Sequence, residues 1–342
     1  MLDITKMFFN PITNSIRIWT DGDLDKFKND LNNNLISELS ILLSKFIYDN
    51  KTKLCFDFST EHHNIFNVLN KNKIDEMRNT FSDNFTFWTG DFNFKNNTPE
   101  EYHNLIEYKS TLHLVPTPTN DTTNVKNRKF RKKFLCPMGR YKKERWRLYN
   151  FIKNNDDLEK NFYYSFNCID SIEGYPTKLL ESKNTRIAKE REIWSNRYFN
   201  KLHTTSFCSV VSETLFNNDN PVKFISEKIY RPITSQQPFI VLGQSNVLSI
   251  LKQFGFKTFD KWWDESYDQE LSEEIRFNKI FKLINELNKK SLDELHEIYL
   301  EMIPILKHNF DLVHNISKQE FSCKSFMQNR NYPECELGDL IL

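Results

Sequence analysis

The chain has 342 residues, enough for two domains of ordinary size, and hydrophobic residues make up 39% of it. Aromatic residues contribute 14%, so the chain can build packed cores and lacks the composition of a disordered protein. Its 47 basic and 46 acidic residues nearly cancel, which argues against binding to DNA, RNA or an anionic membrane through bulk charge.

The glycine and cysteine content excludes further classes of protein. Only seven glycines occur, and neither G-x-G-x-x-G nor G-x-x-x-x-G-K-[ST] is present, so a phosphate group must be held by side chains and helix N-termini. The six cysteines form no C-x-x-C pair, which favours buried thiols in a reducing compartment. No apolar stretch approaches the roughly 20 residues of a membrane span and no leader pattern is present, so we expect a soluble, cytoplasmic protein.

The first part of the chain alternates apolar runs with helical spacing. Apolar runs predict strands at 15–19, 53–58, 85–89 and 111–115. Leucine and phenylalanine recur every three or four residues from Leu24 to Phe46, which predicts a helix, and a shorter helix is expected at 65–69. This alternation is typical of an α/β unit on a parallel sheet, so we expect residues 1–125 to form a first domain.

Residues 116–129 read PTPTNDTTNVKNRK and have no hydrophobic period, so they are the best linker candidate. A second alternation follows, with strands expected at 134–136, 161–166, 206–216, 238–242 and 257–259. Helices are expected at 144–153, 182–202, 245–254, 268–288 and 291–309. We therefore expect a second α/β domain over 126–309 and a weakly patterned tail over 310–342 that packs back on the first domain.

The most informative segment is 224–233, which directly precedes the apolar strand candidate at 238–242. Ser226 can cap a helix there, and helix N-termini favour anions. The carboxylate of Glu227 can accept both hydroxyls of a ribose, and the ammonium of Lys228 can contact a phosphate. The same residues are also common capping chemistry, so a structural interpretation stays open.

A basic turn within residues 132–147 joins an expected strand to an expected helix. Ligands of α/β proteins bind at the carboxyl ends of strands, and arginine suits a two-bond grip on phosphate oxygens. Arg140 and Arg145 are the candidates. A solvated basic face or a nucleic-acid patch over 126–147 is the alternative, although the run lacks interleaved surface aromatics for base stacking.

These segments together resemble a known family. The strand, basic turn and helix at 132–153, the strand near 163–166, SVVSETLF at 209–216, and SEKIYRPI with PFIVLG are similar to fucosyltransferase-like glycosyltransferases of the GT-B type. The resemblance covers about residues 130–290, and 251–268 looks like relatives from large viruses and phages. It implies an α/β protein with two Rossmann-like domains facing each other across a cleft, the second holding the donor, and host cytoplasm as the location if the chain is viral.

The resemblance also implies an activity: inverting, metal-independent transfer of a hexose or deoxyhexose from a nucleoside diphosphate to a glycan hydroxyl. No cofactor is expected beyond the nucleotide-sugar co-substrate, with a GDP-sugar favoured. Donor contacts are implied for Arg140, Arg145, Glu213, Ser226, Glu227 and Lys228. In that scheme Glu227 holds the ribose, Lys228 the diphosphate, and the arginines its phosphates from the facing turn. The helix start continues as IYRPI, where better-known fucosyltransferases carry an aromatic and small residues, so the sugar and base stay open.

Sugar transfer also needs a base for the acceptor hydroxyl. In the GT-B arrangement the N-terminal domain supplies it. Glu61, after the strand at 53–58, is the preferred catalytic residue, and Asp91, after the strand at 85–89, is the second candidate. An ordinary surface-loop acid is the alternative for both.

Other signals favour simpler explanations. Asp21 and Asp23 resemble the DxD of metal-dependent GT-A transferases but lie very near the first residue, so we expect them to cap the next helix. His62 and His63 are adjacent, point apart and have no partners at zinc spacing, so no metal site is expected.

Three acids, Asp264, Glu265 and Asp268, are expected near a helix start, with a border of the donor site as the alternative. Trp262 and Trp263 are expected in packing contacts. Two further functions stay open: a module that binds a nucleotide sugar or glycan without catalysis, and a nucleic-acid-acting protein such as a DNA-base glucosyltransferase. Nucleic acid is the less favoured partner.

Overall fold

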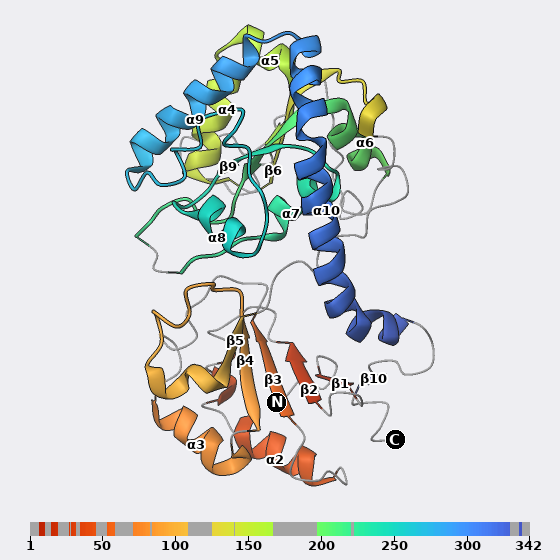
Figure 1. The fold of residues 1–342 in the computed structure, drawn as a ribbon. Coiled ribbons are helices and arrows are strands. Elements are labelled where there is room, and N and C mark those ends of the chain that lie inside the picture. Colours follow the sequence, from red (N-terminus) through yellow and green to blue (C-terminus); the bar gives the residue numbers. More distant parts are fainter. Residues whose placement is uncertain are drawn as a thin grey trace. The chain divides into compact units, whose positions relative to one another are not determined.

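The computed structural model describes residues 7–10, 15–19, 27, 29–31, 35–45, 53–58, 71–82, 84–108, 125–139, 141–166, 197–219, 222–328 and 335–336. The chain forms two compact units, both α/β (Figure 1). Unit 1 comprises Met1–Thr111, Asn220–Phe224 and Lys318–Leu342, and unit 2 comprises Leu112–Asp219 and Ile225–Ser317. The chain therefore leaves unit 2 after Asp219 and returns to it at Ile225.

Unit 1 is built on a six-stranded sheet in the order β10-β1-β2-β3-β4-β5. Its strands are β1 (Met7–Asn10), β2 (Ser15–Trp19), β3 (Lys53–Phe58), β4 (Phe85–Thr89), β5 (Ile106–Tyr108) and β10 (Cys335–Glu336). Strands β2 to β5 run parallel, while β1 pairs antiparallel with β2 and β10. Buried residues of α2 (Leu35–Lys45), α3 (Lys71–Phe81) and the 3-10 helix η3 (Glu100–Leu105) join those of the strands in one hydrophobic core.

Unit 2 is built on a four-stranded parallel sheet in the order β7-β6-β8-β9. Its strands are β6 (Lys132–Met138), β7 (Phe162–Phe166), β8 (Ser206–Ser212) and β9 (Phe239–Leu242). Its helices are η6 (Val125–Asn127), α4 (Lys143–Lys153), α5 (Asp156–Asn161), α6 (Arg197–Thr205), α7 (Glu227–Thr234), α8 (Val247–Gln253), α9 (Glu273–Asn288) and α10 (Leu292–Gln328), which continues into unit 1. All seven residues of β8 are buried, as suits a strand inside a parallel sheet.

The strand order of unit 2 creates a switch point. Strand β7 follows β6 in the chain and pairs with one edge of it, while β8 pairs with the other edge. The connections from this pair of strands therefore leave in opposite directions along the sheet. In open α/β sheets, ligands bind outside the carboxyl ends of the strands at such a point. The fold thus directs attention to the residues that follow Met138 and Ser212.

Several expected elements differ from the observed ones. Residues 257–259 form no strand, because the backbone N–H of Lys257 and that of Phe259 donate to the side chains of Asn309 and Glu265. The segment after residue 309, expected as a weakly patterned tail, is helical up to Gln328. The expected elements at 65–69 and 111–115, and the linker up to residue 124, lie outside the described residues.

Three cysteines of the described part, Cys55, Cys136 and Cys208, are buried free thiols, as expected from the sequence. Burial raises the pKa of the Cys136 thiol to about 12, so it stays protonated at neutral pH. Within the described residues, no helix is long and apolar enough to cross a bilayer.

Candidate functional site

The first turn of α7 forms one side of the candidate site. Ser226 caps the helix in an extended conformation, and its hydroxyl oxygen accepts the backbone N–H of Lys228 at 3.3 Å. Ser226 is fully buried, whereas the Glu227 and Lys228 side chains keep 22% and 26% of their surface exposed. The two charged side chains at this helix start can therefore meet a ligand that Ser226 cannot reach.

Glu213, the first residue after β8, lies beside this helix start and is 0% exposed. Its Oε2 atom accepts the Ser226 hydroxyl at 2.5 Å, the Ser226 backbone N–H at 3.3 Å and the Thr214 backbone N–H at 3.1 Å. Its Oε1 atom has no hydrogen-bond partner among the residues that the structure describes. Burial raises the pKa of the Glu213 carboxyl, and the charge of Lys228 opposes that rise.

Lys228 connects the helix start to the end of β8. Its ammonium group donates to the hydroxyls of Ser226 and Thr214, at 3.1 Å each, and lies 3.2 Å from a carboxylate oxygen of Glu227. Two of its three contacts are to neutral hydroxyls. An anion that replaces either hydroxyl gives this ammonium a stronger, charge-assisted hydrogen bond.

Two cations approach residues 212–214 from α4 and the turn before it. Arg145 shares the buried face of α4 with Leu148 and Ile152, at the spacing of one helix face, and is only 4% exposed. Its guanidinium donates to the hydroxyl and carbonyl of Ser212, at 3.2 and 3.3 Å, and to the Glu213 carbonyl at 3.2 Å. Lys142, the residue before α4, donates to the Thr214 carbonyl. Burial lowers the pKa of both cations.

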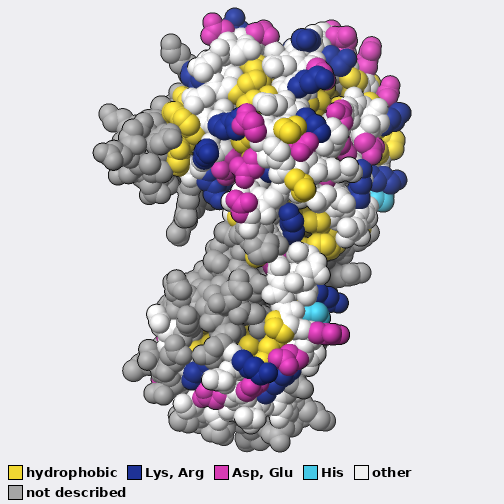
Figure 2. All heavy atoms as spheres, turned by 90° about the vertical axis from the view of Figure 1, so that its left-hand side faces the viewer, with side chains coloured by type: hydrophobic (Ala, Val, Ile, Leu, Met, Phe, Trp, Pro, Cys, Tyr) yellow, Lys and Arg dark blue, Asp and Glu magenta, His cyan; other side chains and the backbone are white. Residues whose placement is uncertain are grey.

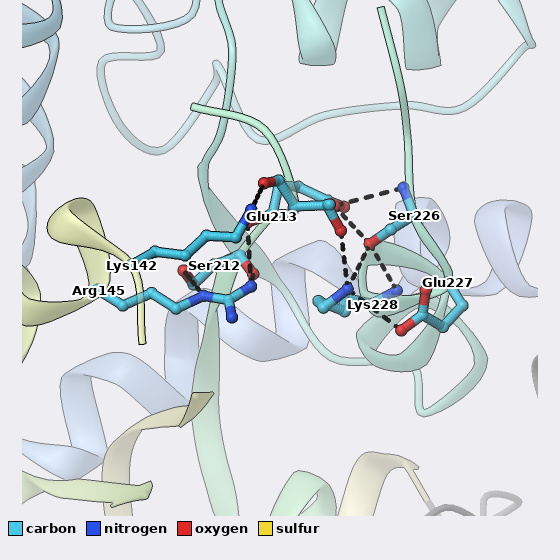
Figure 3. A network of polar contacts seen from close by, with 8 residues as sticks. Lys142, Arg145, Ser212, Glu213, Ser226, Glu227 and Lys228 are labelled. Atoms are coloured by element: carbon cyan, nitrogen blue, oxygen red, sulfur yellow. Dashed lines mark hydrogen bonds and ion pairs between the residues drawn. The ribbon is translucent and has the colours of Figure 1, made fainter. Parts of the chain in front are cut away.

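Figure 3 shows how these groups converge. Lys142 and Arg145 lie on one side of Glu213, and Ser226, Glu227 and Lys228 lie on the other. The cations come from segments that follow β6 and β8, so they meet at the switch point of the unit 2 sheet. Three cations beside a capped helix N-terminus suit a ligand with more than one negative charge.

The site brings together five of the residues singled out from the sequence: Arg145, Glu213, Ser226, Glu227 and Lys228. Arg140 and the preferred catalytic residue, Glu61, lie outside the described residues, as do Asp21, Asp23, His62 and His63. Sequence reasoning missed Lys142 and Thr214. Lys142 stood within the basic turn, but nothing in the sequence indicated which lysine of that turn reaches the end of β8.

Asp91, the second candidate for a catalytic base, has a structural role in unit 1. Its Oδ1 atom accepts the backbone N–H of Asn93 at 2.8 Å and that of Lys223 at 2.9 Å, and its Oδ2 atom accepts the Asn97 amide at 3.0 Å. The residue is 1% exposed and forms an isolated antiparallel bridge with Phe224. Both oxygens are engaged in holding a loop, which leaves little capacity for proton abstraction.

The acids near residue 265 also hold backbone. Asp268 accepts the N–H groups of Leu248 and Ser249 in the first turn of α8, and Glu265 accepts the N–H of Phe259 and the hydroxyl of Thr258. They border a pocket of about 380 Å³. That pocket is lined by Leu248, Ser249, Lys252, Asp260, Trp263, Asp264, Glu265, Ser266, Asp268 and Gln269, and by none of the donor candidates.

The tryptophan pair divides between the core and the surface. Trp263 is 7% exposed and packs against Phe259 and Phe207, with ring centroids 5.2 and 6.5 Å apart. Trp262 donates its indole N–H to Glu301 of α10 at 2.9 Å. Trp263 is thus a packing residue, as expected, whereas the contact shown for Trp262 is a hydrogen bond at the surface.

The basic run at 126–147 does not form one patch. Arg128 is buried and donates to the carbonyls of Ser235 and Gln236 at the end of α7, while Arg147 pairs with Glu274 at 2.7 Å and lies over the ring of Phe277. On the face seen in Figure 2, Lys and Arg side chains are interspersed with Asp and Glu. A nucleic-acid surface normally shows a stripe of one sign, which these residues do not provide.

No protein-family model and no curated protein sequence matches this chain. The case for a function therefore rests on the site itself. Among the described residues no group of three potential metal-ligating side chains occurs, and the charged groups of the site are mostly cations.

Proposed function

We propose that the chain is a glycosyltransferase that transfers a hexose or deoxyhexose from a nucleoside-diphosphate sugar to a glycan hydroxyl. The observation that carries the proposal is the convergence of Lys142, Arg145 and Lys228 on residues 212–214, at the switch point of a parallel sheet and beside the start of α7. The resemblance of SVVSETLF and SEKIYRPI to fucosyltransferase-like sequences supports the same assignment.

The chemistry of the donor explains why cations are needed there. A sugar diphosphate leaves with its negative charge on the phosphate oxygens, and fixed cations stabilise the charge that develops during bond cleavage. Lys228 can exchange its neutral hydroxyl partners for a phosphate oxygen, since its side chain is partly exposed. Glu227, next to it, can accept the ribose hydroxyls. The site thus contains a carboxylate for the sugar hydroxyls of the nucleoside and ammonium groups for its phosphates.

The proposal includes the features expected of the GT-B type. The donor belongs to unit 2, the acceptor base to unit 1, and transfer is inverting and independent of metal. Glu61 is the proposed base, and Glu61→Gln should remove turnover while donor binding persists. If the chain is instead a module that only binds the donor, the wild-type protein itself should bind the donor with no turnover across a panel of glycan acceptors.

The donor site is tested by ligand-induced stabilisation. A nucleotide that binds only the folded protein, at a concentration of 100 times its Kd, raises the free energy of unfolding by about 2.7 kcal/mol. A thermal-shift panel of GDP, UDP, dTDP and CMP should therefore show a clear increase in Tm for one of the diphosphates. CMP, which has a single phosphate, should give the smallest shift.

Lys228→Ala then tests the residue assignment. We expect the variant to lose the nucleotide-induced shift while its own Tm stays close to wild type, because the side chain is partly exposed. Lys153→Ala is a matched control, since Lys153 ends α4 and pairs with Glu159 at 2.6 Å, far along the helix from Arg145. Equal nucleotide-induced shifts in the two variants and the wild type would place the nucleotide elsewhere.

A further inference from the structure

Glu213 is a fully buried carboxyl group with two unequal oxygens. Oε2 accepts three hydrogen bonds, from Ser226 N, Ser226 Oγ and Thr214 N, whereas Oε1 has no partner among the described residues. Buried polar atoms in native proteins nearly always have a partner, so an orphaned oxygen needs an explanation. Because the lone pairs of Oε2 are occupied by donors, Oε1 is the oxygen that can take up a proton without breaking a hydrogen bond.

The charged groups around Glu213 come from two sides. From α4 and its preceding turn, Lys142 donates to Thr214 and Arg145 donates to the carbonyl of Glu213 itself. From α7, Lys228 and Glu227 lie beside Ser226. The carboxylate of Glu144 on α4 also interacts electrostatically with Arg145 and Lys142. In the protein without ligand, an ionised Glu213 is thus the buried counter-ion of a predominantly positive site.

The loop after β9 fixes the position of the Glu213 side chain. The Glu213 backbone N–H donates to the Leu242 carbonyl at 2.9 Å, and Gly243 approaches so closely that an added Cβ would lie 3.3 Å from the Cβ and 3.4 Å from the Cγ of Glu213. The Cβ and Cγ atoms of Glu213 are therefore closely packed, which limits movement of its carboxyl group away from a charge that arrives at the site.

A bound diphosphate brings two negative charges to the same cations. Like charges close to a buried carboxylate disfavour its ionised form. We propose, building on the proposed function, that Glu213 is a proton-coupled counter-ion of the donor site: it is ionised while the site is empty and takes up one proton from solvent, on Oε1, when a diphosphate binds. Burial already raises the pKa of the Glu213 carboxyl, and the negative charge of a bound diphosphate raises this pKa further.

The consequence is a pH-dependent affinity with a defined sign. Uptake of one proton on binding makes the affinity fall as pH rises. The fall is up to tenfold per pH unit in the pH range where Glu213 is ionised in the free protein and protonated in the complex. Nucleoside-diphosphate sugars are suitable probes, because both phosphate charges of a diester are constant above about pH 4. Affinities of GDP-fucose, UDP-glucose and dTDP-glucose are measured by calorimetry from pH 5.5 to 8.5.

Glu213→Gln removes the titrating group and keeps the shape of the side chain. For the donor that binds, we expect this variant to show a flat pH profile and, at the upper end of the range, tighter binding than the wild type. Glu144→Gln is the matched control, since Glu144 lies on α4 beside Arg145, is half-buried, and its loss changes the net charge equally. The affinity of this control variant should depend on pH as steeply as that of the wild type.

A second measurement does not depend on the variant. Calorimetry of the wild type in two buffers of different ionisation enthalpy counts the protons taken up on binding, and we expect a value near one in the same pH range. A count of zero at every pH, or equal slopes for wild type and Glu213→Gln, overturns the inference and leaves the donor site standing. Absence of binding by all three donors overturns the proposed function, and the inference with it.

Discussion

Two buried carboxylates, Asp91 in unit 1 and Glu213 in unit 2, sit in similar places and differ in their hydrogen bonding. Each follows the end of a parallel strand, each is at most 1% exposed, and burial raises the pKa of each. Asp91 uses both oxygens, accepting from Asn93, Lys223 and Asn97. Glu213 uses one oxygen three times, and the other has no partner among the described residues.

The difference in hydrogen bonding distinguishes a carboxylate that stabilises the fold from one that can respond to a ligand. The donors to Asp91 come from its own loop and from the returning segment around Lys223, so its carboxylate stabilises the local backbone. Glu213 instead lies among cations that reach partly exposed positions, where a ligand can change the local charge. A buried carboxylate with an oxygen that accepts no hydrogen bond is the better indicator of function. Substitution of Asp91 should therefore affect mainly stability, and substitution of Glu213 mainly ligand binding.

The largest expected effect is the loss of stability in Asp91→Ala. Removal of the carboxylate takes away the acceptor of the part-buried backbone N–H groups of Asn93 and Lys223, and groups left unsatisfied on burial cost about 1–3 kcal/mol each. We expect the free energy of unfolding of unit 1 to fall by about 2–4 kcal/mol, seen in denaturant titration. Glu213→Gln should change stability by much less, because it removes a buried charge and keeps an acceptor for Ser226.

Asn97→Ala refines this prediction. It removes one side-chain donor to Asp91 and leaves both backbone contacts, so we expect about a third of the effect of Asp91→Ala. A variant Asp91→Ala with wild-type stability would show that the three hydrogen bonds do not hold the loop, and the contrast with Glu213 would lose its basis.

A smaller effect is expected at Gly243. An added Cβ would lie 3.2 Å from the Cγ1 atom of Val241 as well as close to Glu213, so Gly243→Ala must displace one of them. Overpacking of this kind costs about 1–3 kcal/mol, and we expect the lower end together with a several-fold loss of nucleotide affinity by calorimetry. Gly139→Ala is the control, because an added Cβ there meets no described atom within 4 Å. Equal affinities in the two variants would contradict the role of Gly243 in positioning Glu213.

The sequence predicted the α/β class and the bounds of several elements. Short segments rich in isoleucine, phenylalanine and tryptophan favour strands, and the expected strands at 15–19, 53–58 and 85–89 match β2, β3 and β4 to the residue. The cap at Ser226 was predictable because serine before a helix start is a local signal. The three-residue strand β5 was missed, since so short a run carries no periodicity.

The geometry of the site was less predictable, because it depends on strand order. Nothing local places β8 next to β6, yet that pairing is what brings Arg145 to Ser212 and Lys142 to Thr214. Equally, no sequence pattern distinguishes Asp91 from Glu213. Both are acids that follow a buried strand. Only their hydrogen bonds in the folded protein show that both oxygens of Asp91 accept and that one oxygen of Glu213 does not.

The smallest expected effect is on the pH dependence of stability in the protein without ligand. The folded pKa of Glu213 is raised, so between the unfolded and folded values the folded protein binds more protons. Its contribution is present in full below the usual carboxyl pKa and is lost as pH rises through the folded pKa. Wild-type Tm should therefore fall with rising pH relative to Glu213→Gln.

The quantity to compare is the difference in Tm between the wild type and Glu213→Gln at each pH, because other groups titrate in the same pH range. Burial lowers the pKa of His203 to about 3, so the unfolded chain binds the extra proton below the usual histidine value and stability falls there as pH falls. Asp91 contributes a slope of the same sign as Glu213. Both are unchanged in Glu213→Gln, so they cancel in the difference. Thermal melts from pH 4.5 to 8 should show the two Tm curves converging at low pH and separating by a few degrees as pH rises. Parallel curves would mean that the pKa of Glu213 is the same in the folded and unfolded protein, and its comparison with Asp91 would then rest on hydrogen bonding alone.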